Sequence, residues 1–326
     1  MKKYNLIIDV EKCEDCNNCF LSCKDEYVDN DWPGYTAAQP RHGHRWINIM
    51  GKERGRFPVV DVAYLPVPCM HCDNAPCIRA AKDAAVYKRD DGIVIIDPVK
   101  ARGRRDIVKA CPYNVIWWNE EQDLPQKCTL CAHLLDDGWK QPRCVQACPT
   151  GALRVVYAED STIQEIIKSE QLEVLHPEYR TQPRVYYKNL FRFFKCFITG
   201  SVAFEKDGMT DCAVGAEVSL VRDSKEINGQ LTDNFGDFRF DKLDEDSGDY
   251  RVEITYKGFE KKVLEIDLNK SSNMGTIIFH RKRSTDHGGA ERKDVDEYLH
   301  RRTGTAMEGR QGDNAGSQDR LSPDAK

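Results

Sequence analysis

Cys13-Glu-Asp-Cys16-Asn-Asn-Cys19-Phe-Leu-Ser-Cys23 is the stretch that decides the fold of this chain. Its first three cysteines are separated by two residues each, and the fourth follows after three more. This spacing is typical of [4Fe–4S] binding, because short steps let a chain reach successive corners of a cuboidal cluster. The fourth cysteine then lies too far round the cube and ligates a neighbouring cluster. The run therefore predicts two clusters, with the missing ligands elsewhere in the chain.

A second cysteine run supplies those ligands. It reads Cys128-x2-Cys131-x12-Cys144-x3-Cys148-Pro149. Exchanging the last cysteine between the two runs completes two four-thiolate sites. The predicted ligands of the first cluster are Cys13, Cys16, Cys19 and Cys148. Those of the second cluster are Cys23, Cys128, Cys131 and Cys144.

A third cysteine group lies between these runs, and its predicted ligands are Cys69, Cys72, Cys77 and Cys111. The cysteines that would form a second, paired site with this group are missing. Ala81 stands where the crossing cysteine would follow Cys77, and the segment 97–110 lacks the three cysteines expected before Cys111. Both losses belong to the same site, so the pattern predicts three clusters and one lost fourth site.

Zinc is the main alternative, because Cys-x2-Cys pairs also build structural zinc sites. The Cys-Pro endings at Cys111 and Cys148, and the four-cysteine run at the N-terminus, favour iron–sulfur clusters. Disulfides are less expected, because residues 1–10 do not resemble a signal peptide that would lead to an oxidising compartment. The other two cysteines, Cys196 and Cys212, have no cluster spacing and are expected to be buried thiols.

Composition excludes several classes of protein. The chain has 326 residues and a formal net charge of −5, without a large basic block, so nucleic acid is not an expected partner. No apolar run approaches the roughly 18 residues of a membrane helix. We expect a cytoplasmic protein without a membrane span.

The predicted fold class is α+β. We expect a duplicated, nested bacterial-ferredoxin-like domain over residues 1–158 and a helical linker over 159–195, where Thr162-x2-Glu165 fits a capping box. Short alternating segments between turn signals then predict an antiparallel β-sandwich or barrel over 196–280, similar to transthyretin or to carboxypeptidase regulatory domains. The polar segment 281–326 is expected to be a disordered tail.

The sequence shows no substrate chemistry of its own. It lacks nucleotide-binding glycine motifs and the His-Glu-x2-His motif, so we predict no catalytic residues and a reacting site on a partner. Four cations adjoin cluster cysteines, which suggests that they raise cluster potentials, although solvated surface charges are the simpler explanation. These cations are Lys12, Lys24, Lys127 and Arg143.

Stretches around and beyond the cysteines carry a family resemblance. They include Trp32-Pro-Gly-Tyr-Thr36, Gly43-His-Arg-Trp46, Pro68-Cys-Met-His-Cys72, Gln126-Lys-Cys-Thr-Leu-Cys131 and Pro183-Arg-Val-Tyr-Tyr-Lys-Asn-Leu190. Over roughly residues 1 to 280 the chain resembles the iron–sulfur subunits of molybdenum enzymes of the dimethyl-sulfoxide-reductase family. Within that family it is most similar to the small subunits of pyrogallol–phloroglucinol transhydroxylases.

The resemblance implies an electron-transfer subunit with a large catalytic partner. That partner would carry molybdenum on a bis-molybdopterin guanine dinucleotide cofactor and move a hydroxyl group on or between polyphenol rings. Two other hypotheses remain open: a subunit of another molybdopterin oxidoreductase, of the oxyanion or sulfoxide reductase type, and a free-standing ferredoxin-like carrier. An assembly scaffold with structural clusters is a further alternative.

Overall fold

The computed structural model describes residues 1–81 and 83–280. The predicted disordered tail, residues 281–326, lies outside the described residues. In the described part of the chain, helices and strands are mixed, and no helix is long and apolar enough to cross a membrane. The α+β class is confirmed.

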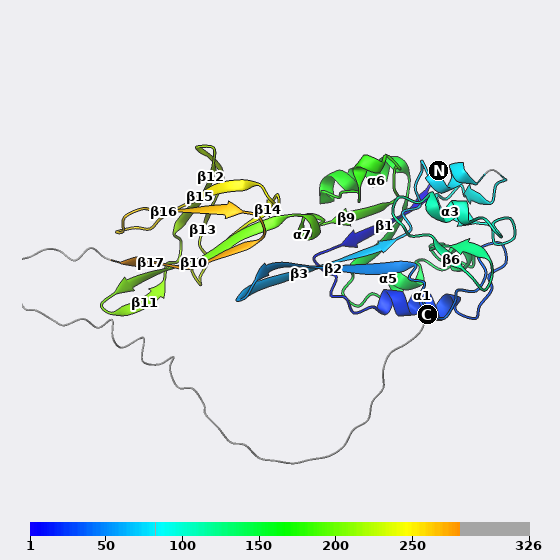
Figure 1. Cartoon of the computed structure of the whole chain (residues 1–326), viewed down its shortest axis with the longest axis horizontal. Coiled ribbons are helices and arrows are strands. Elements are labelled where there is room, and N and C mark those ends of the chain that lie inside the picture. Colours follow the sequence, from blue (N-terminus) through cyan, green and yellow to red (C-terminus); the bar gives the residue numbers. More distant parts are fainter. Residues whose placement is uncertain (82, 281–326) are drawn as a thin grey trace, which may run out of the picture. The chain divides into compact units, whose positions relative to one another are not determined.

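A three-stranded sheet organises the cysteine-bearing part of the chain (Figure 1). Its central strand β1 (Lys3–Asp9) pairs antiparallel with β8 (Leu153–Ala158) and parallel with β9 (Val185–Lys188). Side chains alternate across β1. Leu6 and Ile8 join the main hydrophobic cluster, whereas Ile7 packs with Ile163 of helix α6 (Asp160–Glu170) on the other face. Both faces of β1 are therefore buried.

The β1–β8 pair brings the two ends of the cysteine-rich region together. Strand β1 leads into the first run and β8 follows the second run, so their pairing places the runs side by side. Helix α1 (Asn18–Tyr27) of the first run accordingly packs against α5 (Arg143–Gln146) of the second. Helix α4 (Ala132–Asp136) lies between the second run's cysteines in sequence.

The inner segment repeats this arrangement on a smaller scale. Helix α2 (Pro76–Ala80) packs against α3 (Arg105–Lys109), and two hairpins accompany them. The hairpins pair β4 (Val86–Lys88) with β5 (Val94–Ile96), and β6 (Trp117–Asn119) with β7 (Leu124–Gln126). Asp91-Gly92 turns the first hairpin, as expected of this dipeptide.

Two local details differ from expectation. Helix α6 begins at Asp160, and no side chain caps its N-terminus, so the predicted capping box at Thr162 is wrong. A long hairpin, β2 (Ile47–Arg56) paired with β3 (Val59–Pro68), occupies much of the segment before Cys69. Its charged and glycine-containing β2 does not show the alternation on which strand prediction depends. The chain then continues through the short helices η1 (Pro177–Tyr179) and α7 (Phe191–Phe194).

The remaining strands form two four-stranded sheets that share one hydrophobic cluster. The first sheet contains β10 (Cys196–Lys206), β11 (Met209–Cys212), β14 (Asp237–Leu243) and β17 (Ser272–His280). The second contains β12 (Glu217–Arg222), β13 (Lys225–Leu231), β15 (Gly248–Thr255) and β16 (Lys262–Leu268). These sheets do not close into one barrel.

Two predictions for this region need correction. Strands β10 and β17 pair in parallel, so the region is not purely antiparallel. Cys196 is buried as predicted, but Cys212 is exposed. Cys212 is the last residue of β11, an edge strand whose residues are all exposed, so nothing covers its thiol.

An ion network ties the β2–β3 hairpin to β14. Asp61 pairs with Arg54 of the same hairpin, with Arg192 at 2.7 Å and with Arg239 of β14 at 2.8 Å. Arg54 also reaches Asp241 at 3.2 Å, and its side chain is only 2% exposed. Burial alone would raise the pKa of Asp61, but bonds to the arginines outweigh it and lower the pKa to about 2.

We expect Asp61→Asn to destabilise the protein by roughly 3 to 5 kcal/mol at pH 7, because it removes the carboxylate that three arginines share and leaves the buried Arg54 with its longer, 3.2 Å contact to Asp241. Urea unfolding followed by far-UV circular dichroism under anaerobic conditions measures this. Because the folded pKa of Asp61 lies below its ordinary 3.8, the advantage of the wild type is full above about pH 4 and is lost as the pH falls towards 2.

Asp223→Asn is the matched control, because the Asp223 carboxylate is 93% exposed and its nearest cation is 4.0 Å away. It should change the free energy of unfolding by less than about 0.5 kcal/mol. Equal effects of the two substitutions would contradict a structural role for the Asp61 network.

Candidate iron–sulfur centres

The first cysteine group combines the loop before α1 with the turn after α5. Cys13 and Cys16 come from the loop, Cys19 lies in the first turn of α1, and Cys148 comes from the turn after α5. Asp15 and Asn17 have left-handed φ angles of 52° and 59°, so the chain curls between the cysteines.

The thiols of this group influence one another. The pKa of Cys19 is raised to about 12, first by burial and then by the nearby Cys13, Cys148 and Cys16. The structure therefore brings all four predicted ligands together. Cys16 is the one exposed member.

The second group encloses a cavity. Cys23, Cys128, Cys131 and Cys144 line it, together with apolar and aromatic side chains such as Leu6, Tyr27 and Trp46. Burial is the main reason why the pKa of Cys128 is raised to about 12. Among the described residues, no Asp or Glu lines this cavity.

The third group encloses a cavity of the same kind. Cys69, Cys72, Cys77 and Cys111 line it, with Lys127 and apolar residues completing the wall. Burial first, then the neighbouring Cys69, raises the pKa of Cys72 to about 12. The three groups predicted from spacing are thus three clusters of side chains in space.

The two Cys-x2-Cys loops share a local turn. The backbone N–H of His71 lies 3.5 Å from Cys69 Sγ, and that of Leu130 lies 3.3 Å from Cys128 Sγ. Both residues have positive φ angles, 44° and 53°. Backbone donors directed at sulfur stabilise negative charge there, which suits a thiolate bound to a cluster.

Among the positions from which the sequence predicts that a fourth site was lost, three are apolar and buried in the structure. Ala81, which replaces the crossing cysteine, is buried in the main hydrophobic cluster. From the segment that lacks cysteines, Ala101 and Ile107 are fully buried in the same cluster. These three residues are part of the hydrophobic core.

The donor sets fit a thiolate-bound cluster. Thiols with raised pKa values ionise in such surroundings only when a bound metal supplies compensating positive charge. Sulfur ligands around an apolar, carboxylate-free cavity suit iron–sulfur chemistry. Among residues 1–81 and 83–280, no three His, Cys, Asp or Glu side chains form a group that could hold a single metal ion.

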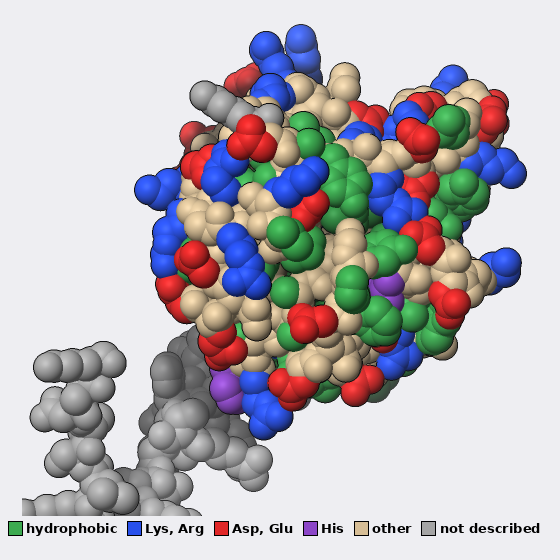
Figure 2. Space-filling model, turned by 90° about the vertical axis from the view of Figure 1, so that its right-hand side faces the viewer, with side chains coloured by type: hydrophobic (Ala, Val, Ile, Leu, Met, Phe, Trp, Pro, Cys, Tyr) green, Lys and Arg blue, Asp and Glu red, His purple; other side chains and the backbone are tan. Residues whose placement is uncertain are grey.

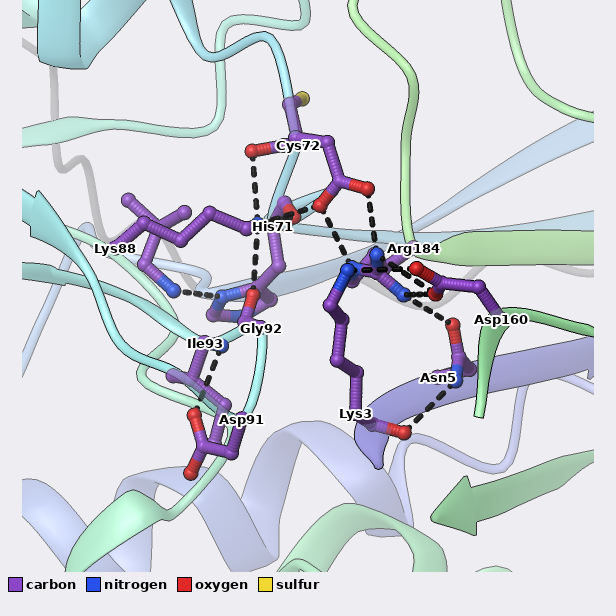
Figure 3. A network of polar contacts seen from close by, with 12 residues as sticks. Lys3, Asn5, His71, Cys72, Lys88, Asp91, Gly92, Ile93, Asp160 and Arg184 are labelled. Carbon is purple, nitrogen blue, oxygen red and sulfur yellow. Dashed lines mark hydrogen bonds and ion pairs between the residues drawn. The ribbon is translucent and has the colours of Figure 1, made fainter. Parts of the chain in front are cut away.

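A buried charge network holds the third cysteine loop in place (Figure 3). Arg184, which is 3% exposed, donates to both carboxylate oxygens of Asp73 at 2.7 and 2.5 Å. It also reaches Asp160 at 3.1 Å and the side-chain oxygen of Asn5 on β1 at 3.2 Å. Lys88 pairs with Asp73 at 2.9 Å.

Lys88 also acts directly on the loop. Its Nζ donates to the carbonyl oxygens of His71 and Cys72 at 3.0 Å each and to that of Gly92 at 2.9 Å. The network therefore links the third loop to β1, α6 and the start of β9. Sequence reasoning did not single out these charges, since long-range ion pairs leave no spacing signal; Arg184 appeared only within the 183–190 motif.

Comparison with known proteins identifies relatives of the cysteine-bearing part and of the longer chain. A family model described as a 4Fe-4S dicluster domain matches residues 60–158. The chain is 47% identical over 280 residues to the pyrogallol hydroxytransferase small subunit of Pelobacter acidigallici, which covers 85% of this chain and 99% of that protein. The chain belongs to this small-subunit family. The family resemblance deduced from the sequence is confirmed.

More distant relatives share a shorter part of the chain. A putative iron–sulfur subunit of dimethyl sulfoxide reductase from Halobacterium salinarum is 35% identical over 211 residues, 58% of this chain and 80% of that protein. A tetrathionate reductase subunit from Salmonella typhimurium is 32% identical over 192 residues, 58% of this chain and 73% of that protein.

We expect Arg184→Gln to destabilise the protein by roughly 3 kcal/mol, because it removes the buried arginine of a bidentate ion pair with the partly buried Asp73. Burial would raise the pKa of Asp73, but Arg184 and Lys88 together keep it below its ordinary value, so loss of Arg184 should raise it. Anaerobic urea unfolding measures the stability, and iron analysis should show a loss of up to about four atoms per chain from the third site.

Arg180→Gln is the control, since Arg180 is exposed and close in sequence. It should leave both stability and iron content close to those of the wild type. If Arg184→Gln behaves in the same way, the network does not support the third loop.

Proposed function

We propose that this chain is the electron-transfer subunit of a molybdopterin enzyme and that it holds three [4Fe–4S] clusters. The observation that carries the proposal is the convergence of twelve cysteines into three separate groups of four, in a chain of the pyrogallol hydroxytransferase small-subunit family. When bound, a [4Fe–4S] cluster takes up and releases one electron. We assign no catalytic residue to this chain and place the reacting site on the partner.

The proposed ligands are the groups predicted from spacing. Cys13, Cys16, Cys19 and Cys148 hold the first cluster; Cys23, Cys128, Cys131 and Cys144 the second; and Cys69, Cys72, Cys77 and Cys111 the third. The walls of the second and third cavities exclude water, whereas exposed Cys16 leaves the first site near the surface. Exchange of ligands between the two runs keeps the first and second sites adjacent, as stepwise electron transfer requires.

The proposed partner is a large subunit with molybdenum on a bis-molybdopterin guanine dinucleotide, acting on polyphenols such as pyrogallol. The extent of similarity supports this choice over other molybdopterin oxidoreductases. An alignment that covers 85% of the chain necessarily runs into β10–β17, whereas the reductase subunits match only 58%. We assign the two sheets of β10–β17 to a β-sandwich with a role in docking, and the complex to the cytoplasm.

The surface supports a protein partner. Figure 2 shows a face on which hydrophobic side chains are interspersed with charges of both signs, without a field of one sign. Nucleic-acid-binding surfaces are strongly basic, whereas protein interfaces mix apolar and polar groups. A mixed surface on a chain with a net charge of −5 agrees with a protein complex.

Anaerobic isolation from the native host tests the proposal. We expect this chain to purify with a large molybdenum-containing chain and to carry about twelve iron and twelve sulfide atoms. Zinc in place of iron would refute the cluster assignment. Iron–sulfur clusters in a chain that purifies without a large partner would favour the free-standing carrier.

Cys72→Ser should remove the third cluster, about four iron atoms per chain, and leave the complex assembled. Transhydroxylation has no net redox change, so the electron path is needed only to bring the molybdenum to its working oxidation state. The pre-reduced variant should therefore still convert pyrogallol, while reactivation of oxidised enzyme by an external reductant slows at least about tenfold.

The same variant separates the alternatives. A net hydroxylation of resorcinol or dehydroxylation of a catechol needs electrons at every turnover, so Cys72→Ser would stop it even after pre-reduction. Unchanged turnover and unchanged reactivation would favour the scaffold, in which the clusters are structural. Cys212→Ser is the control, because the exposed Cys212 belongs to none of the three groups.

A further inference from the structure

Lys127 is a buried cation next to the cysteine groups. Its side chain is about 2% exposed, which places it among the largest fully buried side chains of the described residues. Its Nζ donates to the carbonyl oxygen of Val94 at 2.5 Å and to that of Cys128 at 3.1 Å. These contacts hold the ammonium group in one position between β5 and the second cysteine run.

Lys127 has no carboxylate partner. Within residues 1–81 and 83–280, no ion pair to it is formed, although two other cations near the cysteines, Lys88 and Arg143, are paired. Arg143 lies 3.1 Å from Asp25 and 3.3 Å from Glu26, and Lys88 pairs with Asp73. Carbonyl dipoles alone compensate a buried charge poorly, and burying a charge without an ion-pair partner is unfavourable. A negative group other than a side chain should balance it.

The position of Lys127 identifies that group. Lys127 lines the cavity of the third cysteine group. Burial raises the pKa values of Cys77 and Cys111, and the charge of Lys127 opposes this rise. It opposes the same burial effect at Cys128, which belongs to the second group. One positive charge therefore acts on thiols of both groups.

We propose that Lys127 is a fixed positive charge shared by the second and third clusters, and that it raises the reduction potentials of both. The inference rests on the proposed function. Four thiolates make each cluster net negative, and reduction adds one further negative charge, so a nearby buried cation favours the reduced form. Lys127 therefore acts on the reduction potentials of the clusters and is not a catalytic residue.

The position of Lys127 between two cysteine groups determines which differences in cluster potential it can change. Because Lys127 acts on both clusters, it should change the difference between their potentials little. It should instead raise this pair relative to the first cluster, whose cysteines do not border it. Of the four cations suggested by the sequence, Lys12 is exposed to water, which screens its charge.

Lys127→Met, which removes the charge at similar length, tests the proposal in the anaerobically purified complex. Lys127→Gln is a second variant that keeps a hydrogen-bond donor for Val94. Redox titration monitored by electron paramagnetic resonance should show two of the three cluster potentials falling. The expected change in each reduction equilibrium is at least about tenfold, or 59 mV for one electron.

Lys12→Gln is the matched control, because Lys12 also directly precedes a cluster cysteine but is exposed. It should leave all three potentials close to their wild-type values. Unchanged potentials in cluster-loaded Lys127→Met and Lys127→Gln, or an equal fall of all three potentials, would overturn the Lys127 inference alone. A wild-type chain that holds zinc would instead refute the proposed function and this inference with it.

Discussion

The structure depends on bringing cysteine thiols from distant segments of the chain together in three groups, most of whose members are buried or partly buried. Each cysteine group needs residues that are far apart in the chain, and burial by itself makes ionised sulfur unfavourable, as the raised pKa values of Cys19, Cys72 and Cys128 show. The antiparallel pairing of β1 with β8 meets the geometric part of this requirement, since it joins the strand before the first run to the strand after the last. Hydrophobic packing on both faces of β1 then fixes the register.

Charge balance explains much of what surrounds the cysteines. The interior of the cysteine-bearing part contains buried cations, and most have carboxylate partners. Arg184 and Lys88 share Asp73, and Arg143 shares Asp25 and Glu26. Such pairs keep loops in place without adding net charge next to the sulfur ligands. Lys127 differs because it is buried and no described carboxylate pairs with it. A buried, unpaired charge acts strongly on the nearest anion.

The β10–β17 region has its own hydrophobic cluster and carries no cysteine of the three groups. Its connection to the cysteine-bearing part includes ion pairs of Asp61 with Arg192 and Arg239. Ion pairs between such regions specify direction and register more than they add stability. The proposed docking role would require such ion pairs, since they would hold the β10–β17 region in one orientation relative to the cysteine groups.

Cysteine spacing predicted the three groups of cysteines that lie together in the structure, because cluster geometry restricts ligands to short, recognisable steps. The loss of a fourth site stays a prediction. Strand β1 and the hairpin that turns at Asp91-Gly92 depend on local residue patterns and turn chemistry, so their signals lie within short stretches of sequence. The sequence did not show the β2–β3 hairpin, the exposure of Cys212 or the parallel pairing of β10 with β17, because these depend on which strands lie at a sheet edge. Only the tertiary structure decided that Lys127 is buried without a counter-ion and that Arg184 forms its network. Solvation and charge pairing depend on distances between residues far apart in the chain, and the local sequence does not determine these distances.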